Sequence, residues 1–185
     1  SENLDSKTNL IVDLNTSYEE LRTNFSSNAK RNCNKVNKSG LTVDFESKNV
    51  TEYISFFKKH IKNPVTEFHY SCLEKIITES LKNSNGFIAL VKHENEIIAA
   101  SFILKSDNRL IYRTGTSNPK GKDLKAMFFL VESIIKKYQN QNYLLDFEGS
   151  ELEGVARFYK GFGATNTPYY YYKQINNKLL KVFRK

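Results

Sequence analysis

Blocks of apolar and polar positions alternate along the first half of the chain and predict strands and helices in turn. The apolar run at 10–14 predicts a short strand, and Ser17 followed by Glu20 predicts the start of a helix. Apolar residues then recur every three or four positions as far as Val36, and Gly40 is a typical helix end. The pattern predicts one continuous helix over this stretch.

The middle of the chain switches from helical to β periodicity. A short strand is expected over 41–45, and helices are expected over 50–61 and 67–81. Three runs rich in β-forming residues follow, joined by short polar turns, and they predict an antiparallel meander over 86–91, 97–105 and 109–116.

The last third predicts a helix from about Lys122 to Tyr138, a strand over 143–147, a helix over 151–162 and a tyrosine-rich strand near 169–175. A meander followed by a strand–helix–strand crossover predicts an α/β fold, with a mixed sheet and helices on both faces. We expect a single domain over 1–185, with its core at about 10–175 and a basic tail at 176–185.

Composition narrows the class of protein. The 185 residues suit one ordinary domain, and 39% hydrophobic with 26% charged residues argues against a disordered chain. No apolar stretch approaches the ~18 residues of a membrane-spanning helix. The first residues do not show a positively charged segment followed by an apolar one, so we do not expect a secreted protein. Cys33 and Cys72 lie outside any CxxC motif and the three histidines are scattered, so no disulfide framework or metal site is expected. We expect a cytoplasmic protein.

The net charge of +8 comes from two segments, 30–38 and 173–185, which contain basic residues and no acids. Arg31, Lys35 and Lys38 have i, i+4, i+7 spacing and form a basic stripe on the first helix. Such stripes are usually solvated faces, but the missing acids make Arg31 a candidate for binding an anionic or phosphorylated partner.

The loop between the third meander strand and the next helix contains Gly115 and Gly121-Lys122-Asp123. It is not a P-loop, because five residues separate the glycines and Asp123 replaces the magnesium-binding Ser or Thr. Backbone N–H groups and lysines at a helix start nevertheless suit an anionic group. The alternative is an ordinary helix with Asp123 as its N-cap.

Two carboxylates and a tyrosine are the candidates for proton transfer. Asp146 and Glu148 alternate at a strand end, and burial of such a pair raises the pKa toward that of a general base. The alternative is a solvent-facing strand end followed by a helix cap from Ser150 and Glu153. Tyr159 lies on the apolar stripe of the next helix, where it could equally be a packed core residue.

Two segments carry a resemblance to a known superfamily. Asp146-Phe-Glu-Gly-Ser150 and Ala156-Arg-Phe-Tyr-Lys-Gly-Phe-Gly163 resemble GNAT acyltransferases, most closely the branch of Fem-type peptidoglycan aminoacyltransferases and BioF2-like proteins. Ser17-Tyr-Glu-Glu-Leu21 and the run to Gly40 are similar to the helix that opens the second lobe of those proteins. The resemblance extends over about 10–175 and identifies a GNAT-like fold.

The resemblance implies an N-acyltransferase that moves an acetyl, other acyl or aminoacyl group from a CoA thioester or an aminoacyl-tRNA to an amine. Tyr159 would protonate the leaving thiolate, Glu148 would act as the second catalytic residue, and Arg31 and Asp146 would bind the substrate. The splayed strand and the loop after it would bind the donor, through Thr114, Gly115, Thr116, Ser117, Asn118, Lys120, Gly121 and Lys122. The implied acceptor is a small-molecule or cell-wall-precursor amine, and no metal is required.

Two departures from the family pattern leave alternatives open. Only Gly121 remains of the glycines in the Q/RxxGxG/A pyrophosphate loop, so aminoacyl-tRNA is an alternative donor to acetyl-CoA. Fem-type relatives use two lobes, and the chain starts at Ser1 with one, so we expect either that a first lobe has been trimmed or that the protein works differently. The second hypothesis is a non-catalytic GNAT-fold module that binds nucleic acid or another anionic polymer.

Overall fold

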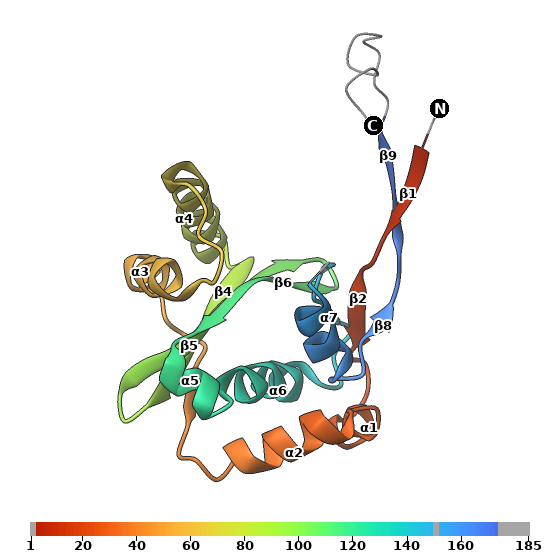
Figure 1. The fold of residues 1–185 in the computed structure, drawn as a ribbon, viewed down its shortest axis with the longest axis horizontal. Helices are drawn as coiled ribbons and strands as arrows, with labels where there is room; N and C mark the ends of the chain where they lie inside the picture. The colour runs from red at the N-terminus through yellow and green to blue at the C-terminus, as the bar shows by residue number, and fades with distance from the viewer. Residues whose placement is uncertain (1–2, 150–151, 174–185) are drawn as a thin grey trace.

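A computed structural model describes residues 3–149 and 152–173, and Figure 1 shows its fold. The chain forms nine strands and seven helices in these ranges. In order they are β1 (Asn3–Lys7), β2 (Leu10–Asp13), α1 (Tyr18–Thr23), α2 (Ser27–Val36), β3 (Thr42–Asp44), α3 (Val50–His60), α4 (Glu67–Lys82), β4 (Gly86–His93), β5 (Glu96–Ser106), β6 (Arg109–Ser117), α5 (Pro119–Asp123), α6 (Ala126–Tyr138), β7 (Leu144–Asp146), α7 (Glu153–Lys160), β8 (Thr165–Asn166) and β9 (Tyr169–Lys173).

Seven strands form one mixed sheet in the order β3-β4-β5-β6-β7-β2-β8. The expected meander is confirmed, because β4, β5 and β6 pair as antiparallel neighbours. β6 and β7 are parallel and are joined by a crossover through α5 and α6, as a parallel pair requires. The expected α/β architecture is therefore confirmed.

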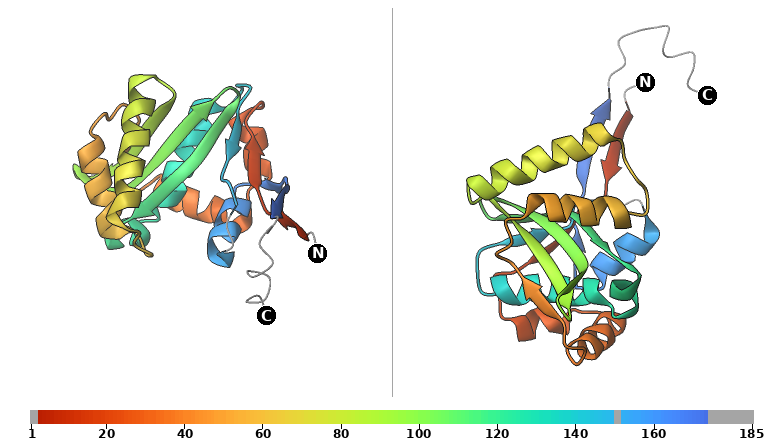
Figure 2. Two further views of the ribbon diagram at one scale, coloured as in Figure 1. Left: turned by 90° about the horizontal axis from the view of Figure 1, so that it is seen from above. Right: turned by 90° about the vertical axis from the view of Figure 1, so that its left-hand side faces the viewer.

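Helices cover both faces of this sheet (Figure 2). α3 and α4 pack on one face, where Tyr53 and Ile77 meet Phe102 in a buried cluster. α6 packs on the other face through residues such as Leu130, with α2 against it, and these elements share a larger core with β2 and β5. The two faces thus have separate cores on either side of the central strands.

The helix expected over the stretch that ends at Gly40 is divided into α1 and α2, so this prediction was wrong. The Ser26 hydroxyl accepts a hydrogen bond from the Ala29 N–H, and the Ser26 N–H bonds the carbonyl oxygen of Gly161. Phe25, just before this cap, packs edge-on against Phe162 with ring centroids 5.2 Å apart. A second N-cap therefore interrupts a stretch whose apolar periodicity is otherwise continuous.

The helix expected to begin near Lys122 is also divided, into α5 and α6. Asn118 caps α5 by accepting a hydrogen bond from the Gly121 N–H at 2.7 Å, so the alternative with Asp123 as N-cap is wrong. Asp123 is instead the last residue of α5. Lys125 has a left-handed φ of 60°, which interrupts the helical path before α6 begins.

β1 and β9 form a separate antiparallel ribbon that runs away from the main sheet (Figure 1). The tyrosine-rich strand is confirmed over Tyr169–Lys173, but β1, its partner, was not expected because its sequence has few strand-forming residues. The tail at 176–185 and the helix cap expected from Ser150 lie outside the described residues.

Candidate functional site

β6 and β7 separate part-way along the sheet. Their parallel register covers three pairs, and the last of them joins Ile111 to Asp146. β6 continues to Ser117 and stays paired with β5 over this part, whereas β7 ends. The edge of β6 that faced β7 is consequently left open, and ligands of α/β sheets bind where neighbouring strands separate in this way.

A β-bulge at Arg113 decides which side chains of β6 face each side of the sheet. Ile103 pairs with Tyr112 and Phe102 pairs with Thr114, so Arg113 is an extra residue. Tyr112 consequently packs in the core on the α6 side.

Thr114 and Thr116 face the α3 side of the sheet. The Thr114 hydroxyl hydrogen-bonds the Tyr53 hydroxyl, and Thr116 donates to the carbonyl oxygen of His60 at 2.9 Å. Both side chains are engaged away from α6, so only the backbone of these two residues is available to a ligand on the α6 side.

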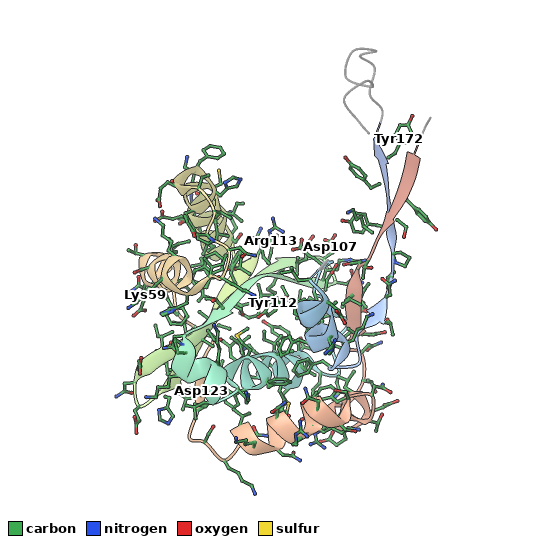
Figure 3. The ribbon with its side chains drawn as sticks, in the orientation of Figure 1. Lys59, Asp107, Tyr112, Arg113, Asp123 and Tyr172 are labelled. Atoms are coloured by element: carbon green, nitrogen blue, oxygen red, sulfur yellow. The ribbon has the colours of Figure 1, made fainter. Side chains whose placement is uncertain are left out.

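A pocket of about 350 Å³ lies on the α6 side, at the open edge of β6. Figure 3 shows Tyr112 on this side of β6. Four elements and the loops between them supply the lining: Tyr112, Gly115, Ser117, Gly121, Lys122, Lys125, Met127, Phe128, Gly154, Val155, Phe158 and Tyr159. Five of the residues chosen from the sequence therefore meet here, namely Gly115, Ser117, Gly121, Lys122 and Tyr159.

Tyr159 brings a neutral phenol to the pocket. Its ring stacks on Phe147 at 4.3 Å and meets Tyr112 edge-on at 5.9 Å. Burial, and to a lesser extent the charge of Glu148, raises the pKa of Tyr159 to about 12. Its hydroxyl makes no hydrogen bond to any other described residue, so it can bond a ligand in the pocket that Tyr159 lines.

Tyr112 is a second pocket tyrosine that the sequence analysis missed. Its buried hydroxyl has no hydrogen-bond partner among the described residues. The Ser101 hydroxyl nearby is also unpaired, and its effect is to lower the pKa of Tyr112. Burial raises the pKa of Tyr112 well above the ordinary value, and the phenols of Tyr159 and Tyr53 raise it further. The phenol oxygen lies over Gly115, where a Cβ would come within 2.1 Å of it. The contact between Tyr112 and Gly115 could not be predicted from strand alternation, because it depends on the bulge at Arg113, which puts both residues on one face of β6.

We predict that Tyr112→Phe does not destabilise the ligand-free chain and raises its stability by about 1 kcal/mol, because the change removes a buried hydroxyl without a partner. Chemical denaturation would measure this, with Tyr53→Phe as the control, since that hydroxyl is bonded to Thr114 and its loss should destabilise. A clear loss of stability in Tyr112→Phe would contradict the assignment.

The two carboxylates at the end of β7 are both held by arginines from β6. The buried Asp146 pairs with Arg109, and its Oδ1 accepts the N–H of Glu148 at 2.8 Å. Glu148 makes a two-oxygen contact with Arg113, at 3.0 and 2.8 Å. Glu148 has a left-handed φ of 55° beyond the end of β7, so the strand alternation expected for this pair does not govern its placement.

The loop before α5 is already bonded within the chain. Asn118 accepts the N–H groups of Gly121, through its side chain, and of Lys122, through its carbonyl. Lys120 pairs with Glu94 and Glu96 at the β4–β5 turn. The expected cradle of N–H groups at this helix start is thus largely occupied.

The start of α6 is the more open position. Lys122 and Lys125 line the pocket beside it, and no side chain caps this helix. Two lysines and the positive end of α6 therefore border one end of the pocket.

Arg31 lies apart from the pocket. It is exposed on α2 and donates to the Asn28 side-chain oxygen at 2.9 Å. Its neighbours in the stripe, Lys35 and Lys38, are also exposed. The structure does not bring Arg31 together with Tyr159, so its role as a substrate-binding residue stays a prediction.

Within residues 3–149 and 152–173, no three His, Cys, Asp or Glu side chains are grouped closely enough to hold a metal ion. Across the same ranges, no helix combines the length and apolar character that a membrane span requires.

Comparison with solved structures identifies the fold. FemX superposes with a TM-score of 0.72 at 12% identity, and the match covers 96% of this chain and 64% of FemX. The chain has the GNAT fold. L-PGS from Bacillus licheniformis matches with a TM-score of 0.62 at 15% identity over 98% of this chain and 64% of its own. A GNAT-family acetyltransferase from Colwellia psychrerythraea matches at 0.53 and 11% identity, over 92% and 55%.

The resemblance to GNAT proteins of the Fem type is thus confirmed for the fold. No family model matches the sequence, and no curated protein sequence matches it significantly. The GNAT-fold chain spans less than two thirds of the length of FemX and L-PGS.

Proposed function

We propose that this GNAT-fold chain is an N-acyltransferase, which moves an acyl or aminoacyl group from an activated donor to an amine. The observation that carries the proposal is the separation of β6 from β7 beyond Ile111 and Asp146, directly beside Tyr159. Backbone N–H groups on the open edge of β6 can stabilise the oxyanion that forms on the acyl carbonyl.

The pocket supports an acyl-CoA as donor. Its volume of about 350 Å³ is in the lower range for ligand sites, which suits an acyl group and a thioester arm rather than a whole nucleotide. Aromatic and aliphatic side chains such as Phe128, Val155 and Phe158 line it. Lys122, near the end of α5, and Lys125, directly before α6, suit the negative charges of the nucleotide part.

The chain supplies the groups that transfer requires. The donor's carbonyl carbon forms a C–N bond with the amine and loses its C–S bond. Tyr159 gives its proton to the departing thiolate and recovers one from the new amide nitrogen. The proton that the original ammonium loses first passes to Glu148. The products are an amide, a free thiol and one proton.

Aminoacyl-tRNA remains the second donor class, in keeping with the Fem-type resemblance. The exposed basic residues Arg31, Lys35 and Lys38 on α2 favour it, and they equally favour the alternative of a nucleic-acid-binding module without catalysis. Salt dependence separates binding through this stripe from binding in the pocket, because a polyanion held by the stripe would lose log affinity linearly with log salt.

We expect acetyl-CoA to raise the melting temperature of the chain. Lys122→Gln combined with Lys125→Gln should weaken its binding about tenfold, because two cations beside the start of α6 are lost. Calorimetry measures the affinity. Lys75→Gln with Lys82→Gln on α4 is the matched control, since it removes the same charge from exposed positions away from the pocket. No binding of any acyl-CoA at millimolar concentration would overturn the acyl-CoA donor and leave aminoacyl-tRNA.

A further inference from the structure

Two arginine–carboxylate pairs join β6 to β7, but they lie in different surroundings. Arg109 and Asp146 are within the region of the parallel ladder, and Asp146 is 6% exposed. Arg113 and Glu148 lie beyond the end of the ladder, with 50% and 41% of their side chains exposed. The first pair therefore belongs to the fold, whereas the second borders the open edge of β6.

Two unusual backbone features produce the second pair. Arg113 is the extra residue of the bulge in β6, and Glu148 has a left-handed φ of 55°. Glu148 is held there because its carbonyl accepts the Leu10 N–H at 3.0 Å and its own N–H bonds Asp146. Non-glycine residues in this conformation cost energy and cluster at ligand sites. Two independent irregularities thus converge on one exposed ion pair.

The ion pair is also placed where an acceptor has to approach. Tyr112 and the pocket are on the α6 side of β6, whereas Figure 3 shows Arg113 on the opposite side. A donor in the pocket leaves this opposite side of the gap for the amine. Burial, and after it the charge of Glu148, raises the pKa of Tyr159, so Glu148 lies near this phenol.

We propose that the acceptor amine belongs to an α-amino acid, whose carboxylate binds Arg113 while its ammonium faces Glu148. An exposed ion pair contributes little to stability, so a ligand that replaces both partners can open it. Because the Arg113 nitrogen and the Glu148 oxygens are in direct contact, a ligand with closely spaced opposite charges needs the least movement. An α-amino acid has this spacing, and its carboxylate frees Glu148 to accept the ammonium proton. This inference rests on the proposed N-acyl transfer.

The test compares three acceptors of equal side chain with acetyl-CoA as donor: leucine, leucinamide and isoamylamine. Released thiol measures turnover, and calorimetry on the chain saturated with CoA measures acceptor binding. We expect kcat/KM, or affinity if turnover is slow, to be at least about 30-fold higher for leucine than for either analogue. Arg113→Gln should abolish this preference, so that leucine is used or bound no better than the two analogues.

Arg157→Gln is the control, because it removes another arginine–glutamate pair, a more exposed one on α7, and should leave the preference intact. Equal use or binding of the three acceptors by the wild type would overturn the inference, as would a preference that survives in Arg113→Gln. A chain that neither binds nor uses any of the three acceptors also overturns it. If acetyl-CoA binds and only isoamylamine is acylated, the proposed function stands and the inference fails. The lack of any donor binding would instead count against the proposed function.

Discussion

Tyr159→Phe is expected to lower kcat about 100-fold, the usual scale for losing a positioned proton donor, with almost no change in melting temperature. The stability part of this expectation follows from the contacts. The Tyr159 hydroxyl bonds no other described residue, and phenylalanine keeps the stacking on Phe147. The change therefore removes the proton-donating hydroxyl and keeps the packing of the ring.

The pH profile gives an independent readout of the same role. Because burial and then the charge of Glu148 raise the pKa of Tyr159 to about 12, the phenol stays protonated well above its ordinary range. If Tyr159 is the proton donor, its ionisation should not lower kcat until the pH approaches 12. A phenolate acting as base would give a rate that rises with pH instead.

Tyr143→Phe is the control for Tyr159→Phe, because Tyr143 is a half-buried tyrosine that packs on Tyr138 and does not line the pocket. It should retain turnover. Full turnover in Tyr159→Phe would show that Tyr159 is a packing residue only, which is the alternative that its apolar helix stripe allows.

The main elements could be predicted because each has a clear periodicity and its own core face. β4 and β5 each contain six consecutive buried residues, so their apolar runs identify them as central strands. The divisions at Ser26 and Lys125 could not be predicted from periodicity. Each depends on local backbone bonding that competes with a helix, through a cap at Ser26 and a left-handed residue at Lys125.

The candidate site was predictable where local sequence determines it. Gly115, Gly121, Lys122 and Tyr159 meet at the pocket because a strand–loop–helix order brings them there. Arg113 was not predictable, because its contact with Glu148 depends on a bulge and on where the parallel register ends.

Gly121 lines the pocket at the point where α5 lies directly against the backbone of β5. A Cβ at this position would come within 2.1 Å of the Ile98 carbonyl oxygen and 3.0 Å of its carbon. Both atoms belong to the backbone of β5, which also accepts the Asn118 N–H through that oxygen at 3.0 Å. No side-chain rotation can relieve the contact, so α5 would have to move away from the sheet.

We therefore expect Gly121→Ala to destabilise the chain by about 3 kcal/mol, at the upper end for overpacking, and to lower the melting temperature by about 6–12 °C. Gly154 is the matched control. It lines the same pocket from α7, and nothing lies within 4 Å of an added Cβ there. Gly154→Ala should raise stability by about 0.5–1 kcal/mol through better helix propensity. Thermal unfolding of both variants measures the contrast, and a Gly121→Ala chain as stable as the wild type would mean that α5 is not pressed against β5. Because the two glycines border one pocket, opposite signs would show that the close approach of α5 to Ile98, rather than any property of the pocket, requires a glycine at 121.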